Sequence, residues 1–234
     1  MYAFWACKDI GNFGDMVTPY ILEKLGQTVE FSWMQGIALD GSILGVVKPN
    51  MHVYGVGFMN VTDKCESNNI KYVRGEISKA ILKAQGFDVS NIKTHIPAFC
   101  IAEFIQDKTP TKDKDYAFHY TDYSDLGIDV RQPVENVVNQ ILNSKNIITS
   151  SLHAYIVARM YGRGAALVRT KQPVAGDGMK YVDAFSCWGE KSYIPLDIQN
   201  DSGIENELKR TYGNPIKFDN KQFLKDLNDY ICQL

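Results

Sequence analysis

The chain has 234 residues, of which 45% are hydrophobic and 22% are charged, and its formal net charge is −2. A chain of this length and composition buries a sizeable core, which excludes a wholly disordered protein and a small disulfide scaffold. The 25 basic and 27 acidic residues leave no excess of positive charge, so we expect no nucleic-acid partner. The net charge does not exclude a small basic pocket for an anion, because it does not report on local charge.

The cysteines and the apolar segments indicate the cellular compartment in which the protein works. The five cysteines are widely spaced and form no CxxC motif, which argues against a disulfide framework and a zinc cluster. No apolar run approaches the roughly 18 residues of a membrane span. The apolar stretch 1–7 is followed by Lys8 and Asp9 without a basic leader or a cleavage site, and reads as a strand. We therefore expect a cytoplasmic protein with no integral membrane segment.

The first half of the chain alternates short apolar runs with amphipathic segments. The helix expected at 77–84 carries apolar residues at i, i+3, i+4 and i+7. A glycine-rich turn at 11–15 separates the first strand from a short helix. The elements expected in this half are strands at 2–6, 53–56 and 71–73, and helices that end at Gly26 and at Gly86.

The second half repeats the alternation after a polar, charged segment at 106–115, which we interpret as a linker. The elements expected here are strands at 116–120 and 147–149, a turn at 143–146, and helices at 134–142, from Ser150-Ser151 to about Gly162, and at 223–234. Alternating strands and helices indicate βαβ units around parallel sheets. We predict an α/β fold with two Rossmann-like lobes, 1–107 and 116–234.

The segment 147–154 (IITSSLHA) carries the strongest candidate site. The first N–H groups of a helix lack internal acceptors and lie at the positive end of its dipole, so Ser150, Ser151 and these amides form a natural anion site. His153 falls in the first turn and is suited to proton transfer near neutral pH. The competing interpretation is a serine N-cap followed by a surface histidine.

Three further loops follow predicted strands, where open parallel sheets bind ligands. Arg74 stands at a strand end and suits a phosphate or carboxylate, although it could pair with an acidic neighbour such as Glu76. In the turn 11–15, Asn12 and Gly14 could approach a ligand and Asp15 could accept a proton, or Asp15 could cap the helix. The segment 118–123 (FHYTDY) places His119 at the expected cleft, or at an ordinary strand end.

The segment 176–183 (GDGMKYVD) predicts a mobile loop before a short structured piece. Lys180 is a candidate for ligand contact there. The competing interpretation is an ordinary surface loop. The turn 11–15 is not a GxGxxG fingerprint, so a dinucleotide is not indicated. The sequence also lacks HExxH, GxSxG and any histidine pair at metal-ligand spacing. We therefore expect no metal.

Taken in order, these motifs resemble the polysaccharide pyruvyl transferase family over residues 1 to about 190, and SSLHA is the most specific of them. The matching segments are 12–15 (NFGD), 41–44 (GSIL), 55–58 (GVGF), 73–78 (VRGEIS), 97–98 (PA), 119–122 (HYTD), 149–154 (TSSLHA) and 178–183 (GMKYVD).

The resemblance implies a GT-B-like fold and transfer of the pyruvyl group of phosphoenolpyruvate to two hydroxyls of one sugar, giving a cyclic ketal. It implies a donor site made by Arg74 and His153, with backbone contacts from Ser151 and Leu152. We predict His153 as the general acid and Asp15 as the base on the sugar side. The expected partners are phosphoenolpyruvate, as donor substrate rather than cofactor, and a sugar or oligosaccharide acceptor, free or lipid-linked.

The chain departs from the family at His95-Ile96, where many members have Gly-Asp, and it is shorter than many of them. This departure and the short chain keep open a non-catalytic relative that binds a sugar or an anion. A nucleotide-sugar glycosyltransferase on the same GT-B-like scaffold is the other alternative. Fold alone does not separate them, since function lies in the site.

Overall fold

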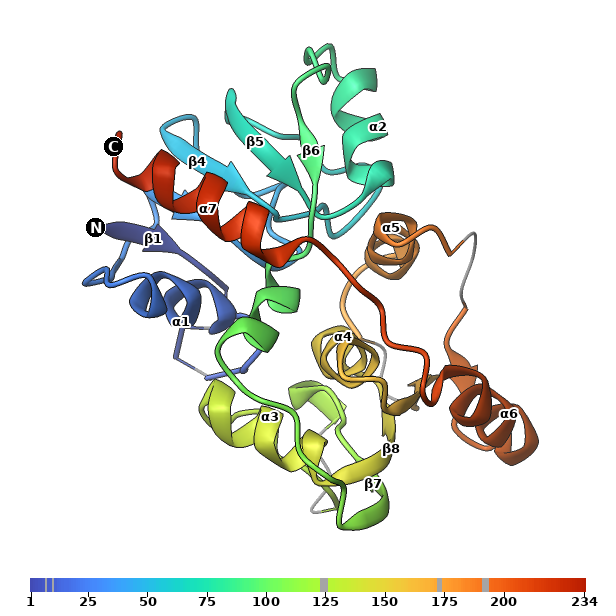
Figure 1. The fold of residues 1–234 in the computed structure, drawn as a ribbon. Helices are drawn as coiled ribbons and strands as arrows, with labels where there is room; N and C mark the ends of the chain where they lie inside the picture. The colour runs from blue at the N-terminus through green and yellow to red at the C-terminus, as the bar shows by residue number, and fades with distance from the viewer. Residues whose placement is uncertain (7, 10, 123–125, 172–173, 191–193) are drawn as a thin grey trace.

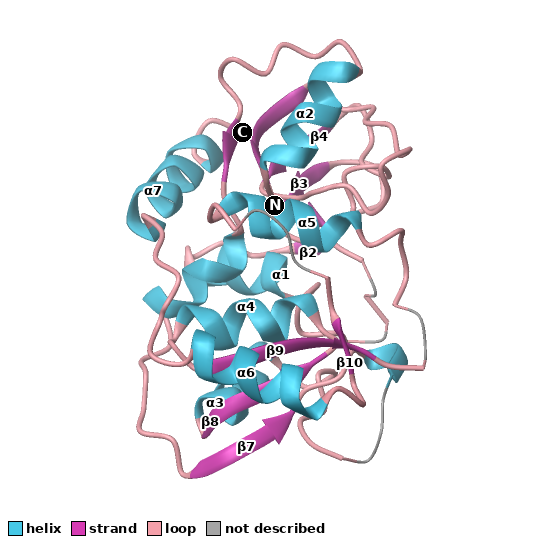
Figure 2. Cartoon of the chain, turned by 90° about the vertical axis from the view of Figure 1, so that its right-hand side faces the viewer, coloured by secondary structure: helices cyan, strands magenta, loops and turns pink. Residues whose placement is uncertain are grey.

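The computed structural model describes residues 1–6, 8–9, 11–122, 126–171, 174–190 and 194–234. Its strands form two parallel sheets, with the first in the upper part of Figure 2 and the second in the lower part. The first sheet has the order β2-β1-β3-β4-β5-β6. Its strands are β1 (Tyr2–Phe4), β2 (Glu30–Phe31), β3 (Gly36–Ala38), β4 (Met51–Tyr54), β5 (Asn69–Val73) and β6 (Lys93–Thr94).

The second sheet has the order β10-β9-β8-β7 and is built from the second half of the chain. Its strands are β7 (Lys112–Tyr116), β8 (Ser144–Thr149), β9 (Gly164–Arg169) and β10 (Leu196–Asp197). The two central strands, β8 and β9, are almost wholly buried. The predicted α/β class with parallel sheets is confirmed.

The helices cover these sheets (Figure 1). They are α1 (Val17–Lys24), α2 (Glu76–Ala84), α3 (Val134–Leu142), α4 (Leu152–Met160), α5 (Met179–Cys187), α6 (Asp201–Thr211) and α7 (Asn220–Ile231), with 3-10 helices η1 (Pro97–Glu103) and η2 (Tyr120–Asp122). Within the described ranges, no helix has the length and hydropathy needed to cross a membrane.

The strand expected at 116–120 is wrong in its position. Strand β7 instead starts at Lys112, inside the expected linker, and pairs with β8 from the Lys112–Ser144 register onward. β8 accordingly begins inside the expected turn 143–146. Because β7 is an edge strand, charged side chains such as Lys112 and Asp115 are tolerated along it, and they gave it the pattern of a linker.

Residues 176–183, expected as a loop and a short structured piece, lead into a full helix, α5. Gly178 adopts a φ of 88° directly before that helix, which accounts for the loop-like sequence there. Further elements of the described chain were not predicted from the sequence. They are β2, β3, β6, β9, β10, η1, η2 and α6.

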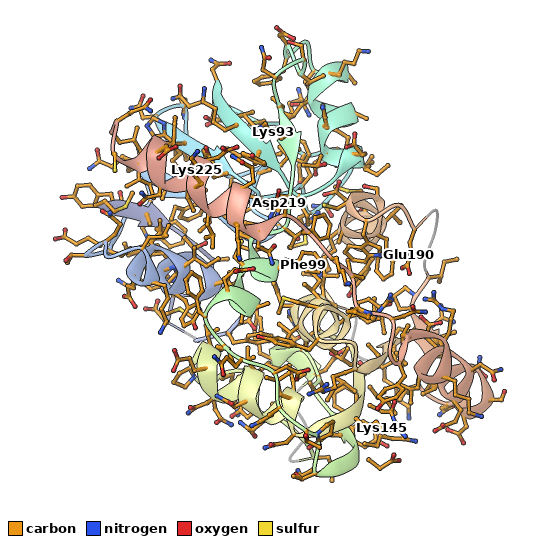
Figure 3. The ribbon with its side chains drawn as sticks, viewed as in Figure 1. Lys93, Phe99, Lys145, Glu190, Asp219 and Lys225 are labelled. Atoms are coloured by element: carbon orange, nitrogen blue, oxygen red, sulfur yellow. The ribbon has the colours of Figure 1, made fainter. Side chains whose placement is uncertain are left out.

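The last helix, α7, lies beside the first sheet although the chain reaches it from the second (Figures 1 and 2). The carboxylate of Asp226 accepts hydrogen bonds from the Tyr72 hydroxyl at 2.5 Å and from Lys93 Nζ at 2.8 Å. The Asn220 side chain donates to the carbonyl of Phe99 at 2.9 Å, and Figure 3 shows Phe99 in η1 near the start of this helix. These contacts hold the C-terminal helix on the first sheet.

Helix α5 also contacts the first half of the chain, because the Glu76 N–H at the start of α2 donates to Ser186 Oγ at 2.9 Å. Packing therefore crosses the division between 1–107 and 116–234, and those boundaries stay a prediction. One apolar cluster extends from β1 and η1 through α3 and α4 to α7, so residues from both halves share a core.

Candidate active site

A cavity of about 100 Å³ lies where the loops that follow the strands of both sheets meet. Every part of its lining comes after the carboxyl end of a strand, as expected for ligand sites in parallel α/β sheets. The lining residues are Ala6, Asn12, Asp15, Ser42, Ile43, Met59, His119, Tyr120, Ser151, Leu152, His153, Ala175 and Lys180.

The N-terminus of α4 forms one wall of this cavity. Ser151 caps the helix, and its Oγ accepts the Ala154 N–H at 3.4 Å. The N–H groups of Leu152 and His153 lie in the first turn, where helix geometry supplies no internal acceptor. A small anion in the cavity would therefore meet two amide donors at the positive end of a helix dipole.

Ser150 lies just behind the cavity wall and orders the neighbouring loop. Its hydroxyl donates to Asp122 Oδ2 at 2.6 Å and accepts the His119 N–H at 2.9 Å. His119 in turn lines the cavity, with its Nδ1 2.7 Å from Thr121 Oγ1. Tyr123, which belonged to the same predicted motif, lies outside the described residues.

His153 pairs with a carboxylate that the sequence analysis missed. Its Nε2 lies 3.3 Å from Asp40 Oδ1, and Asp40 is buried behind β3. The backbone N–H of Gly41 donates to Oδ1 at 2.6 Å and that of Ala98 donates to Oδ2 at 2.8 Å. Asp40 is therefore held rigidly and fixes the orientation of the imidazole. The available signal was an acidic residue directly after a buried strand, beside Gly41.

Gly14 makes room for the same imidazole. A Cβ placed on Gly14 would lie 2.1 Å from His153 Nδ1, well inside van der Waals contact. In the same turn, the Asn12 side chain donates to Asp15 Oδ2 at 2.7 Å, and both side chains line the cavity. Asp15 does not cap helix α1, because Met16 occupies the N-cap position and makes no side-chain hydrogen bond there.

Lys180 brings a buried positive charge to the cavity. Only 7% of the residue is exposed, and its Nζ donates to the carbonyl of Ala175 at 2.9 Å. Burial, reinforced by the charge of Arg74, lowers the pKa of Lys180 to about 8, against an opposing effect of Asp15. Burial likewise lowers the pKa of His119 to about 4, with Lys180 as the second cause.

Arg74 lies behind the cavity and does not line it. Its Nε donates to Asp183 Oδ2 at 2.8 Å, and this carboxylate is fully buried. Its other two nitrogens donate to Ser42 Oγ at 2.5 Å and to the carbonyl of Phe58 at 2.7 Å. The predicted partner Glu76 is thus replaced by Asp183, and the guanidinium supports the wall that contains Ser42.

The cavity thus brings together seven of the ten candidate residues, from both halves of the chain. These are Asn12, Asp15, His119, Ser151, Leu152, His153 and Lys180. Gly14 and Ser150 lie against its wall. Over the described ranges, no three His, Cys, Asp or Glu side chains are grouped so that they could hold a metal ion.

No protein-family model and no curated protein matches the chain. Among solved structures, an uncharacterized protein from Klebsiella pneumoniae is 14% identical with a TM-score of 0.45, over 79% of this chain and 86% of that one. Two structures of the wall teichoic acid polymerase TagF are 11% identical with TM-scores of 0.49, over 99% and 100% of this chain and 88% of theirs. Similarities of this size carry no conclusion about activity.

Proposed function

We propose that the chain is a transferase that moves the pyruvyl group of phosphoenolpyruvate onto two hydroxyls of a sugar. The observation that carries this proposal is one small cavity that joins an open helix N-terminus, the His153–Asp40 pair and the buried Lys180. Such a set binds an anion and supplies a proton donor next to it. The motif resemblance supplies the choice of donor.

The size of the cavity favours a small donor. Pockets for drug-sized ligands measure about 300–1,000 Å³, whereas this cavity measures about 100 Å³. Phosphoenolpyruvate has several times fewer non-hydrogen atoms than a nucleotide sugar. The second candidate, a nucleotide-sugar glycosyltransferase, would have to hold most of its donor outside this cavity.

The reaction divides into four bond changes. His153 gives its proton to C3 of phosphoenolpyruvate, so that the methylene becomes a methyl group and C2 becomes electrophilic. A sugar hydroxyl then forms the first bond to C2 and loses its proton to Asp15. The C2–O bond to phosphate breaks and inorganic phosphate leaves. The proton held by Asp15 leaves with the phosphate. The second hydroxyl then adds to C2 and closes the ketal ring, and its proton passes to His153, which restores the acid.

The donor's negative charge is shared between the first-turn amides of α4 and Lys180. We assign Arg74 a supporting role in place of a direct contact, because its guanidinium already makes three hydrogen bonds inside the protein. It holds Ser42 Oγ in the cavity wall and ties helix α5, which carries Lys180, to the first half of the chain.

Calorimetric titration of phosphoenolpyruvate tests the donor assignment. We expect binding to the wild type, and at least tenfold weaker binding for Lys180→Ala, which removes a buried charge from the cavity. Lys145→Ala is the matched control. Lys145 is an exposed lysine of the second sheet, and it lies far from the first sheet (Figure 3). Phosphate release with a panel of sugars then measures transfer, with His153→Ala and the remote control His52→Ala.

Three results would each redirect the proposal. Binding of UDP or CDP without binding of phosphoenolpyruvate would favour the glycosyltransferase. Binding of phosphoenolpyruvate without phosphate release for any sugar would favour a non-catalytic anion-binding relative. Equal phosphate release by wild type and His153→Ala would remove His153 from the mechanism.

A further inference from the structure

An aromatic cluster lies at the outer edge of the first sheet, where strand β2 ends. Trp33 is 62% exposed and the adjoining Met34 is 65% exposed. The indole packs against Phe31 in an edge-on contact with a 5.0 Å centroid separation, and against Phe4 at 5.3 Å. Trp33 is thus both strongly exposed and held from below by two other rings.

The loop that carries Trp33 is held in place by hydrogen bonds. The Ser32 N–H donates to the carbonyl of Ala3 in β1 at 2.8 Å. Ser32 Oγ accepts the N–H groups of Met34 at 3.2 Å and Gln35 at 3.3 Å. These bonds hold the backbone on both sides of Trp33, so ordering this loop on binding costs little conformational entropy.

This cluster lies at the same edge of the first sheet as the candidate active site. β2 lies next to β1 in a parallel sheet, so the loop after β2 sits at the same carboxyl-end edge as the cavity. Phe4, which contacts Trp33, belongs to one apolar cluster with Ile43, and Ala6 packs against that cluster. Ile43 and Ala6 both line the cavity.

The chemistry of the cluster fits a sugar ring. The electron-rich face of an indole attracts the polarised C–H groups on the flat face of a pyranose. The indole N–H is in addition a hydrogen-bond donor for a sugar hydroxyl. Ser32 and Gln35 add polar groups at the side of the ring. Two exposed apolar side chains are too little surface for a stable protein interface, which buries about 800 Å² on each partner.

We propose that Trp33 is a subsite for the oligosaccharide acceptor, binding a sugar unit next to the one that reacts in the cavity. The inference rests on the proposed function for the identity of the ligand as an acceptor. It assigns recognition of acceptor length to the loop after β2, away from the donor-binding groups of α4.

Tryptophan fluorescence and calorimetry test this subsite. The titrants are glucose, galactose and N-acetylglucosamine and their linear trisaccharides. We expect at least one trisaccharide to change the fluorescence of the wild type, and to bind about 2- to 10-fold more weakly to Trp33→Ala. Trp33→Phe, which keeps an aromatic face, should recover most of the affinity. The matched control is Tyr212→Ala, an exposed aromatic residue after α6.

The monosaccharides and the donor separate this inference from the proposed function. Trp33→Ala should leave monosaccharide and phosphoenolpyruvate affinities unchanged, because neither ligand reaches the loop. Saccharide binding through Trp33 without any phosphoenolpyruvate binding would uphold the subsite and reject the pyruvyl donor.

Two outcomes would overturn the subsite. One is that no trisaccharide of the panel binds, or that all bind Trp33→Ala as tightly as the wild type. The other is a concentration-dependent dimer, seen by sedimentation, that Trp33→Ala dissociates, which would make the cluster a contact between copies of the chain.

Discussion

His153 Nε2 lies 3.3 Å from Asp40 Oδ1, although 113 residues separate the two in the sequence. His153 begins a helix that follows a strand of the second sheet, and Asp40 follows a strand of the first sheet. The pair therefore exists only when the two sheets are correctly placed. It links the assembly of the fold directly to the candidate chemistry.

Asp40→Asn tests that link. Loss of the carboxylate removes the acceptor that orients the imidazole, and proton transfer of this kind contributes about 10²–10⁴-fold to rate. We expect kcat for phosphate release to fall at least tenfold while phosphoenolpyruvate affinity changes less than threefold. Because the asparagine oxygen can still accept one of the two backbone N–H groups, stability should fall by about 1–3 kcal/mol. An unchanged kcat would show that Asp40 has no part in proton transfer.

Gly14→Ala probes the space beside His153. The new Cβ would lie 2.1 Å from Nδ1, so the ring must move off its hydrogen bond to Asp40. We expect activity to be lost and stability to fall by about 1–3 kcal/mol, as for overpacking in a core. Gly203→Ala in α6 is the control, because its Cβ would meet only the side chain of exposed Asn200. Equal activity in both variants would contradict the tight packing described for Gly14.

The Arg74–Asp183 pair should matter more to folding than any surface pair. Arg74→Ala leaves a fully buried carboxylate without its counter-charge, which costs about 3–5 kcal/mol. Lys24→Ala breaks the exposed pair with Glu135, where the expected loss is below about 1 kcal/mol. Urea denaturation of the two variants measures the difference. Similar losses would mean that Arg74 does not support the cavity wall as described.

The pH dependence of stability should report buried His95. This residue is 5% exposed, its ring stacks on Phe223, and burial lowers its pKa to about 4. Asp40 and Asp219 oppose that shift without cancelling it. The unfolded chain takes up the proton near the ordinary pKa of 6.5, so stability falls as the pH drops from 6.5 towards 4.

The loss from His95 alone should amount to about 3 kcal/mol. His119, whose pKa is also lowered to about 4, contributes with the same sign. His95→Phe keeps the stacked ring and should therefore flatten the pH dependence of the free energy of unfolding without abolishing it. Denaturation curves between pH 7 and pH 4 provide the measurement. Parallel curves for variant and wild type would exclude His95 as a source of the dependence.

Lys180 predicts the pH dependence of donor binding. Its pKa of about 8 means that the positive charge is present at pH 7 and is lost as the pH rises through 8. Phosphoenolpyruvate affinity should therefore weaken above pH 8 in the wild type. Lys180→Met should bind weakly at every pH and lose this dependence, as calorimetry at pH 7 and pH 9 would show. A wild-type affinity for phosphoenolpyruvate that is constant over this pH range would exclude a direct contact between Lys180 and the donor.

Local patterns in the sequence determined where most of the buried elements lie and which loops follow them. Apolar periodicity located β1, β4, β5, α2, α3, α4 and α7, because most of them bury one face or a continuous run. The face predicted for α2 is only partly buried, since Ala80 and Ala84 are exposed and Ser78 and Leu82 are buried instead. The turn with Gly14 and Asp15 and the helix start at Ser151 were found from turn and cap chemistry. Edge strand β7 and helix α5 were misjudged, since charged or glycine-containing segments there carry little apolar signal.

Only the tertiary structure decided which of these side chains meet. Arg74 could pair with Glu76 by sequence, yet the packing of α5 against α2 places Asp183 on its guanidinium. Asp40 follows a buried strand, but only the packing of the first sheet against α4 places its carboxylate beside His153. Contacts between residues more than a hundred positions apart depend on how sheets and helices pack. No local pattern encodes that packing, because each segment buries the same apolar face whichever partner covers it.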